Sequence, residues 1–251
     1  VQLSDNSAAT SVPATVTIAA GATSATFNVA TSAVAASTTA SISASYGGGT
    51  QSVSLTVLPS PLPSVASLNV SLASVTGGTS VTGTVTLSGP APAGGAQVAL
   101  SDNSGATSMP STVTVPAGAT SASFSIGTSA VANNTAVTLS ASYGGATRTA
   151  TLTVLHAVLT SLTVNPSSVV GLLGSATGTL TLNGPAPAGG AVVTISDNSG
   201  ACSVPGSVTI PAGATSATFT VRTGLVLITT TCTITGTYKG TSRSDTLRVT
   251  L

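Results

Sequence analysis

The segment Ser-Asp-Asn-Ser occurs three times in this chain, starting at residues 4, 101 and 196. Each copy is followed at a constant distance by Ala-Gly-Ala-Thr-Ser-Ala, then by one phenylalanine and then by one tyrosine. A period of about 95 residues is too long for a solenoid repeat and matches a whole sandwich domain. The repetition therefore predicts a row of similar domains. The repeated aromatic residues are Phe27, Phe124, Phe219, Tyr46, Tyr143 and Tyr238.

The second copy is complete and shows which secondary structure the repeat encodes. Apolar residues alternate with serine and threonine in short runs that glycine- and proline-rich turns separate, and no run has a helical period of useful length. Seven short antiparallel strands, each with one apolar face, form a two-sheet sandwich. The predicted strands cover residues 67–72, 80–88, 96–100, 111–115, 121–126, 135–143 and 147–155.

Four segments of this copy carry a resemblance to a known family. They are Gly-Thr-Val-Thr-Leu (83–87), Pro-Ala-Pro-Ala-Gly-Gly (90–95), Val-Thr-Val-Pro-Ala-Gly-Ala-Thr-Ser-Ala (113–122) and Ala-Thr-Leu-Thr-Val (150–154). Through them the whole chain resembles the tandem bacterial immunoglobulin-like domains, related to fibronectin type III, of secreted and surface proteins. The resemblance implies an all-β fold of tandem immunoglobulin-like β-sandwich domains with about seven strands each. It implies an architecture more firmly than a ligand, and the chain departs from antibody domains because it has no tryptophan and no cysteine pair between the second and sixth strands.

The predicted boundaries give three repeats. The first repeat, residues 1–59, is incomplete, whereas the second, 64–156, and the third, 158–251, are complete. A proline-rich spacer, residues 59–63, joins the first two repeats, and a shorter junction without proline follows residue 155.

The first repeat lacks about 30 residues at its start and cannot close a sandwich alone. The expected explanation is that the chain is a piece of something longer or is cut at its terminus. The alternative is that a neighbouring chain supplies the missing strands, as in donor-strand assembly.

The composition limits the classes of molecule that this chain is expected to bind. Charged residues make up 4% of the chain, the formal net charge is +1 and the mean hydropathy is +0.55. A nucleic-acid-binding protein would show a basic stripe, so no nucleic-acid partner is expected. No apolar run approaches the roughly 20 residues of a membrane helix, so no membrane span is expected.

The residues that could perform chemistry are few. Each Ser-Asp-Asn-Ser motif follows a predicted strand, where aspartate and asparagine set turns. A calcium site needs several converging carboxylates, and each repeat offers one, with Asp245 added in the third. His156, the only histidine, has no acid near it in sequence and is interpreted as a junction residue, not as part of a catalytic triad. We expect no enzyme activity, catalytic residue, cofactor or metal, and the three phenylalanines are expected in the cores.

The sequence of the third repeat departs from that of the second at one end, or pole, of the predicted sandwich. Residues 224–228 read Gly-Leu-Val-Leu-Ile where residues 129–133 read Ser-Ala-Val-Ala-Asn, and two leucines replace Gly77-Gly78 and Thr79. We predict an assembly interface there, in contact with another domain or subunit. The alternative is that these side chains fold inward as extra core. The candidate interface consists of Leu172, Leu173, Leu225, Leu227 and Ile228.

The same repeat holds the only two cysteines, Cys202 and Cys232. A disulfide is the favoured interpretation, because the end of the third strand lies near the start of the sixth in such a sheet. It would stabilise the domain by about 2–4 kcal/mol and would fit an oxidising, extracellular setting. Two free buried thiols are the alternative.

Together these features favour a structural, extracellular array: a fibre, sheath or stalk on a cell surface, assembled through strand and domain-pole contacts. Nearly uncharged strands covered with serine and threonine repel one another little when packed side by side. The expected partners are other copies of the chain or neighbouring domains of a longer chain. The alternatives are an adhesin segment that binds glycans or a host surface, and repeats accessory to a larger secreted enzyme.

Overall fold

The structure is a computed structural model that describes residues 1–172 and 174–251. All regular secondary structure in these residues is β-strand, which confirms the all-β prediction. The chain divides into two compact units, Val1–Leu62 and Pro63–Leu251, and each is described by itself below.

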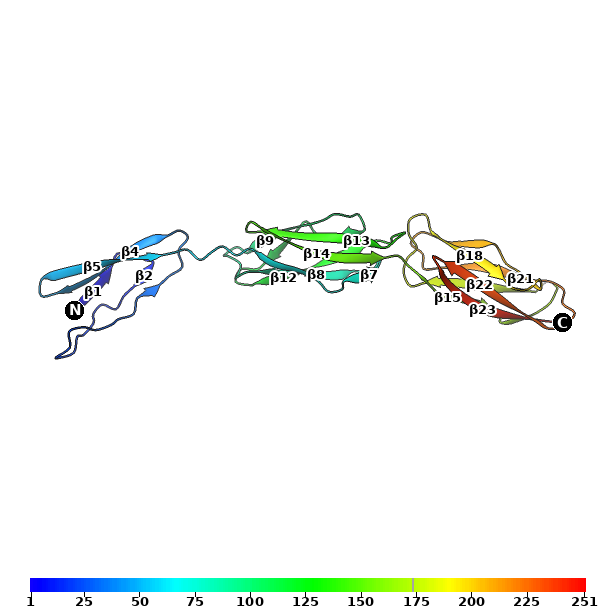
Figure 1. The fold of residues 1–251 in the computed structure, drawn as a ribbon, viewed down its shortest axis with the longest axis horizontal. Helices are drawn as coiled ribbons and strands as arrows, with labels where there is room; N and C mark the ends of the chain where they lie inside the picture. Colours follow the sequence, from blue (N-terminus) through cyan, green and yellow to red (C-terminus); the bar gives the residue numbers. More distant parts are fainter. Residues whose placement is uncertain (173) are drawn as a thin grey trace. The chain divides into compact units, whose positions relative to one another are not determined.

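The second repeat forms two facing sheets, with strand orders β10-β12-β8-β6 and β11-β9-β13-β14-β7 (Figure 1). Its strands are β6 (Val65–Val70), β7 (Ser74–Thr76), β8 (Val81–Leu87), β9 (Ala96–Asp102), β10 (Thr107–Ser108), β11 (Thr112–Val115), β12 (Ser121–Thr128), β13 (Thr135–Tyr143) and β14 (Ala146–Leu155).

Alternation of apolar and polar residues along each strand gives the two sheets apolar faces that form the core between them. In β8, Val81, Val85 and Leu87 are buried, while the threonines between them are not. Successive side chains of a strand point to opposite faces, so the apolar set of each sheet meets that of the other. Gly83 takes the fourth inward place of β8, directly under the ring of Phe124.

The strand count differs from the prediction, and one pairing shown by the structure was not predicted. The repeat has nine strands instead of about seven, because β7 and β10 are additional short strands. Residues Thr112–Val115 pair with β9, in the same sheet as β13 and β14. Segments of two or three residues are too short to show a period, and alternation encodes the buried face of a strand but not its partner.

The third repeat reproduces this arrangement, with sheets β15-β17-β21-β19 and β16-β23-β22-β18-β20. Its strands are β15 (Leu159–Asn165), β16 (Ser168–Val170), β17 (Ser175–Leu182), β18 (Ala191–Asp197), β19 (Cys202–Ser203), β20 (Ser207–Ile210), β21 (Ser216–Thr223), β22 (Thr230–Tyr238) and β23 (Thr241–Thr250).

The first unit has a three-stranded sheet, β1-β4-β5, and a two-stranded pair, β2-β3. Phe27 is 36% exposed, whereas Phe124 and Phe219 are 7% and 8% exposed. The prediction that all three phenylalanines lie in the cores is therefore wrong for Phe27, because the residues described for the first unit include no strand that covers it as β8 covers Phe124. The strands are β1 (Gln2–Asp5), β2 (Thr10–Ser11), β3 (Ala30–Thr31), β4 (Thr38–Tyr46) and β5 (Gly49–Val57).

Candidate functional site

Each of the three Ser-Asp-Asn-Ser motifs adopts the same turn. In the second repeat the carboxylate of Asp102 accepts a hydrogen bond from the backbone N–H of Ser104 at 2.9 Å, and the Ser104 hydroxyl accepts one from Ala106 at 3.2 Å. The same bonds form from Asp5 and from Asp197. Each aspartate thus accepts a hydrogen bond from the backbone two residues after it, as expected for a turn.

The asparagine of the motif makes a long-range hydrogen bond that the sequence did not predict. The side-chain oxygen of Asn103 accepts a hydrogen bond from the backbone N–H of Thr138, in β13, at 2.9 Å. Asn6 and Asn198 do the same with Ser41 and Thr233, each at 2.7 Å. The constant distance of 35 residues between donor and acceptor was the only signal of this link.

Asp245, the fourth carboxylate, is also engaged with backbone groups. Its two oxygens accept hydrogen bonds from the N–H groups of Val164, at 2.7 Å, and Thr246, at 2.8 Å. Among residues 1–172 and 174–251, no group of three or more histidine, cysteine, aspartate and glutamate side chains could hold a metal ion.

His156 lies where the second repeat passes into the third. Its backbone N–H donates to the side-chain oxygen of Asn134 at 2.9 Å, and its Nδ1 lies 2.7 Å from the same oxygen. Two residues later, the N–H of Val158 donates to the side-chain oxygen of Asn183 at 2.8 Å. The linker is therefore held by an asparagine from each repeat.

Direct contacts also join the second and third repeats. Lys239 Nζ donates to Asn133 Oδ1 at 2.9 Å across the junction. A Cβ atom built on Gly78 would lie 2.5 Å from the Cγ of Pro185, so only glycine lets the proline turn of the third repeat approach this closely. We call this set of contacts the inter-repeat junction.

Lys239 makes its contact from an unfavourable backbone conformation. Its φ is +46°, and the equivalent positions in the other repeats are Gly47 (φ +59°) and Gly144 (φ +60°). A bulky residue in the left-handed region costs free energy that the surrounding structure must offset. The preceding Tyr238 is buried, and burial raises the pKa of its phenol above the usual 10.0.

Cys202 and Cys232 form a disulfide, with Cα atoms 6.3 Å apart. Cys202 begins β19 in the four-stranded sheet, and Cys232 lies in β22 of the five-stranded sheet. The disulfide therefore links the two sheets of the third repeat, near the pole where its sequence departs from that of the second.

Four of the five candidate interface residues are exposed at this pole. The exposed fractions are 60% for Leu172, 70% for Leu225, 84% for Leu227 and 75% for Ile228, whereas Val226 between them is buried at 8%. The extra-core alternative therefore does not describe these four side chains. Leu173, the fifth, lies outside the described residues. We call the four exposed residues the leucine pole.

Leu172 also has a left-handed backbone, with φ +51°. Its N–H donates to the carbonyl of Gly224, and Gly78, the equivalent residue of the second repeat, donates to the carbonyl of Thr128 with φ +94°. The leucine thus stands at a position that the second repeat fills with glycine. Two arginines, Arg222 and Arg248, lie close to the ends of β21 and β23 that lead to this pole.

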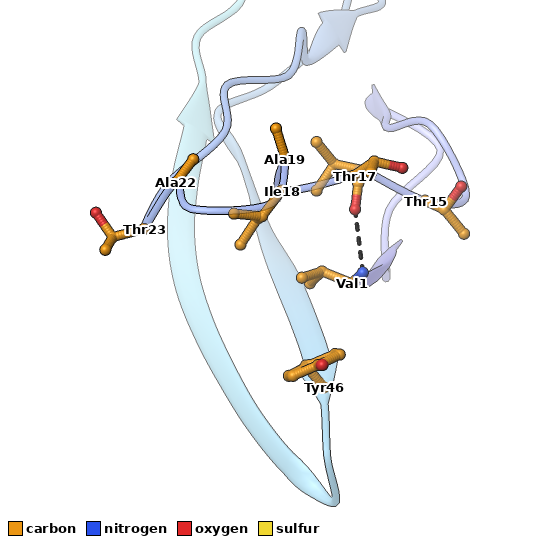
Figure 2. Close-up of a pocket in the computed structure, with 9 residues that line it drawn as sticks. Val1, Thr15, Thr17, Ile18, Ala19, Ala22, Thr23 and Tyr46 are labelled. Carbon is orange, nitrogen blue, oxygen red and sulfur yellow. Dashed lines mark hydrogen bonds between the residues drawn. The ribbon is translucent and has the colours of Figure 1, made fainter.

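The first unit contains a hollow of about 700 Å³, shown in Figure 2. It lies between Val1, Ile18 and Tyr46, and the amino group of Val1 donates to the carbonyl of Val16 at 3.0 Å. Tyr46 is 80% exposed and Ile18 is 40% exposed. We call this feature the Tyr46 hollow.

The second repeat shows what fills the same place in a complete sandwich. Val115, the equivalent of Ile18, is fully buried there. The end of β8 and the turn after it cover this place, through hydrogen bonds from the N–H groups of Leu87 and Ala91 to the carbonyls of Thr120 and Ala119. Apolar and threonine side chains line the Tyr46 hollow, among them Val16, Thr17 and Ile18.

No helix among the described residues is long and apolar enough to cross a membrane.

Comparison with known proteins gave matches in structure only. No protein-family model and no curated protein matches the sequence. The D0-D1 domain of intimin is 14% identical, with a TM-score of 0.31, over 75% of this chain and 100% of that chain. The Yersinia pseudotuberculosis adhesin InvE is 14% identical, with a TM-score of 0.38, over 75% of this chain and 59% of that chain.

Domains 4–9 of the surface layer protein SbsC are 13% identical, with a TM-score of 0.33, over 89% of this chain and 36% of that chain. Because these scores are low, the fold assignment comes from the strand order of this chain. Two facing sheets recur from β6 to β14 and from β15 to β23, antiparallel except for the parallel pairs β7 with β14 and β16 with β23, and this order makes the chain an array of tandem immunoglobulin-like repeats.

Proposed function

We propose that this chain is a structural component of an extracellular or cell-surface array, with the three repeats 1–59, 64–156 and 158–251 as its building blocks. The observation that carries the proposal is the inter-repeat junction. Hydrogen bonds from Lys239, His156 and Val158 and the close contact of Gly78 with Pro185 fix one domain on the next. A fixed junction transmits position and force, which a spacer or fibre requires.

The exposed faces of the strands support the same proposal. Hydroxyl groups pair across neighbouring strands in all three repeats, at 2.8 Å in each case. These pairs satisfy surface hydroxyls without charge, and cross-strand pairs of this kind stabilise a sheet. A neutral face of this type favours side-by-side association. The pairs are Ser45 with Thr50, Ser142 with Thr147 and Thr237 with Ser242.

The location outside the cytoplasm rests on the disulfide. Disulfides form and persist in oxidising compartments, and that between Cys202 and Cys232 joins the two sheets of one repeat.

Electron microscopy of the native material tests the structural role. We expect ordered filaments or sheets that lose their order when the Lys239 contact is removed. Dispersed single chains that bind on a glycan array would instead support the adhesin alternative. Recovery of the complete gene with a catalytic domain would support the accessory role in an enzyme.

A further inference from the structure

We propose that the outward faces of the long strand pairs β4–β5, β13–β14 and β22–β23 bind the same faces of a second copy of this chain. We call the outward residues of each pair the hydroxyl face of that repeat. The inference rests on the proposed structural role and names the surface through which neighbouring chains would pack. The hydroxyl faces consist of alternate residues in 39–45 and 50–56, in 136–142 and 147–153, and in 231–237 and 242–248.

The hydroxyl faces share one composition. In β14 the outward residues from Thr147 to Thr153 are all threonine, while Leu152 and Val154 between and beside them are fully buried. The first repeat has only serine and threonine on this face, the second departs from that rule at Ala136, and the third departs from it at Arg248. The same surface is therefore repeated along the chain.

The other charged side chains of β14 and β23 point to the opposite sheet. The Nε atoms of Arg148 and Arg243 donate to the carbonyls of Ala66, at 3.0 Å, and Thr160, at 2.9 Å. Asp245 likewise accepts a hydrogen bond from the backbone of β15. The hydroxyl faces are thus almost free of charge, so a second copy meets little electrostatic repulsion there.

The hydroxyl groups of these faces are already paired with one another. Oxygen atoms of directly opposite side chains lie 2.8–2.9 Å apart in every repeat. A hydroxyl that has a partner loses less when water is removed, and the threonine methyl groups beside it gain from burial. Because a hydroxyl group both donates and accepts, such a face is complementary to a copy of itself.

The other surfaces of the sandwich are less suited to this contact. On the outward faces of the four-stranded sheets, the described residues form one cross-strand hydroxyl pair, Thr84 with Ser123 at 3.1 Å. The edge strands β7 and β16 have three residues, and β11 and β20 have four and are followed directly by Pro116 and Pro211. Short edges and proline hinder the addition of a strand from another chain.

The size of a hydroxyl face sets how many repeats must take part. Three neighbouring strands of nine residues form a strip about 14 Å wide and about 30 Å long, or roughly 400 Å². A stable interface buries about 800 Å² on each partner. The face of one repeat is therefore too small, and the contact requires the faces of at least two repeats in each chain.

Sedimentation velocity of the full chain over a range of concentrations tests the contact. The face variant carries Thr149→Lys and Thr246→Lys, on the hydroxyl faces of the second and third repeats. The control variant carries Ser125→Lys and Thr220→Lys, at exposed positions on the outward faces of the four-stranded sheets, and has the same net charge. We expect the unmodified chain to form oligomers, the face variant to associate at least about tenfold more weakly and the control to stay within about twofold.

A variant of opposite charge shows whether like faces meet. Thr149→Glu with Thr246→Glu should also weaken association by itself, whereas its equal mixture with the lysine face variant should associate at least as strongly as the unmodified chain. Equal melting temperatures of all variants are expected, because every substituted side chain is exposed. Failure of the mixture to associate would overturn the proposal.

Three other results would also overturn it. They are a monomeric unmodified chain, a lysine face variant that associates fully, and a control variant that is weakened as much as the face variant. Binding of a neutral glycan that the face variant loses and the control keeps would make the glycan, not a second copy, the occupant of the hydroxyl face.

The structural role itself would fail in a different way. Dispersed native chains that bind a glycan array in the experiment above would contradict that role. Filaments that the face variant forms with full order would contradict only the contact between hydroxyl faces.

Discussion

Lys239 Nζ lies 2.9 Å from Asn133 Oδ1, and this hydrogen bond joins the third repeat to the second. The lysine takes a φ of +46° to make it, at a position where the other repeats have glycine. The residue that attaches the third repeat to its neighbour thus has an unfavourable backbone conformation.

Replacement of this residue, Lys239→Gly, should separate the two effects. We expect the free energy of unfolding of the third repeat to stay level or rise by up to about 1 kcal/mol, because glycine relieves the left-handed strain. The junction should become more mobile, which faster hydrogen exchange at residues 156–158 would show. Asn133→Ala, the matched control, should loosen the junction without stabilising the repeat, and slow exchange in both variants would contradict the prediction.

Leu172→Gly should stabilise the third repeat. Its φ of +51° is unfavourable for leucine, and the side chain is largely exposed, so little packing is lost. We expect a gain of up to about 1 kcal/mol in urea unfolding. A loss of stability would show that the side chain packs within its own repeat. Leu225→Ala, at a position without this strain, should leave stability within about 0.5 kcal/mol.

Gly83→Ala should destabilise the second repeat. A Cβ atom there would lie 2.4 Å from the ring of Phe124, too close for any side chain to be accepted without movement. We expect a cost of about 1–3 kcal/mol, which calorimetry can measure. Gly89→Ala, where a Cβ atom meets nothing within 4 Å, is the control and should be close to neutral. Partial rescue of Gly83→Ala by Phe124→Leu would confirm the cause.

Loss of the disulfide should weaken the third repeat only. Cys202→Ser with Cys232→Ser removes the link between β19 and β22 and should cost about 2–4 kcal/mol. Thermal unfolding with and without reductant should show the same shift in the unmodified chain and none in the variant. An equal shift of the second repeat, which has no cysteine, would contradict the assignment.

Truncation of the repeated phenylalanine should have unequal effects. Phe124→Ala leaves a cavity in the core and should lower the free energy of unfolding by about 3–5 kcal/mol. Phe27→Ala removes a side chain that is 36% exposed and should cost about 1 kcal/mol in the first unit. Equal costs would show that Phe27 is covered in solution, for example by strands that dock on this unit.

The sequence predicted several parts of the fold because each depends on local pattern. Alternation of apolar residues with threonine along β8 and β13 set which face of each strand is buried. The aspartate turns were predictable because Asp102 bonds to a residue only two positions away. The hydrogen bond from Thr138 to Asn103 was not, since the two residues are 35 positions apart and no local rule connects them.

The sequence by itself determined the repeat, the all-β class, the cysteine pair and the place where the third repeat is remodelled. Only the tertiary structure decided that β11 pairs with β9, that Phe27 is partly exposed and that Leu172 and Lys239 have left-handed backbones. The physical reason is one of range. Burial periodicity and turn chemistry act over a few residues, whereas strand pairing, coverage and backbone strain depend on which distant segments meet.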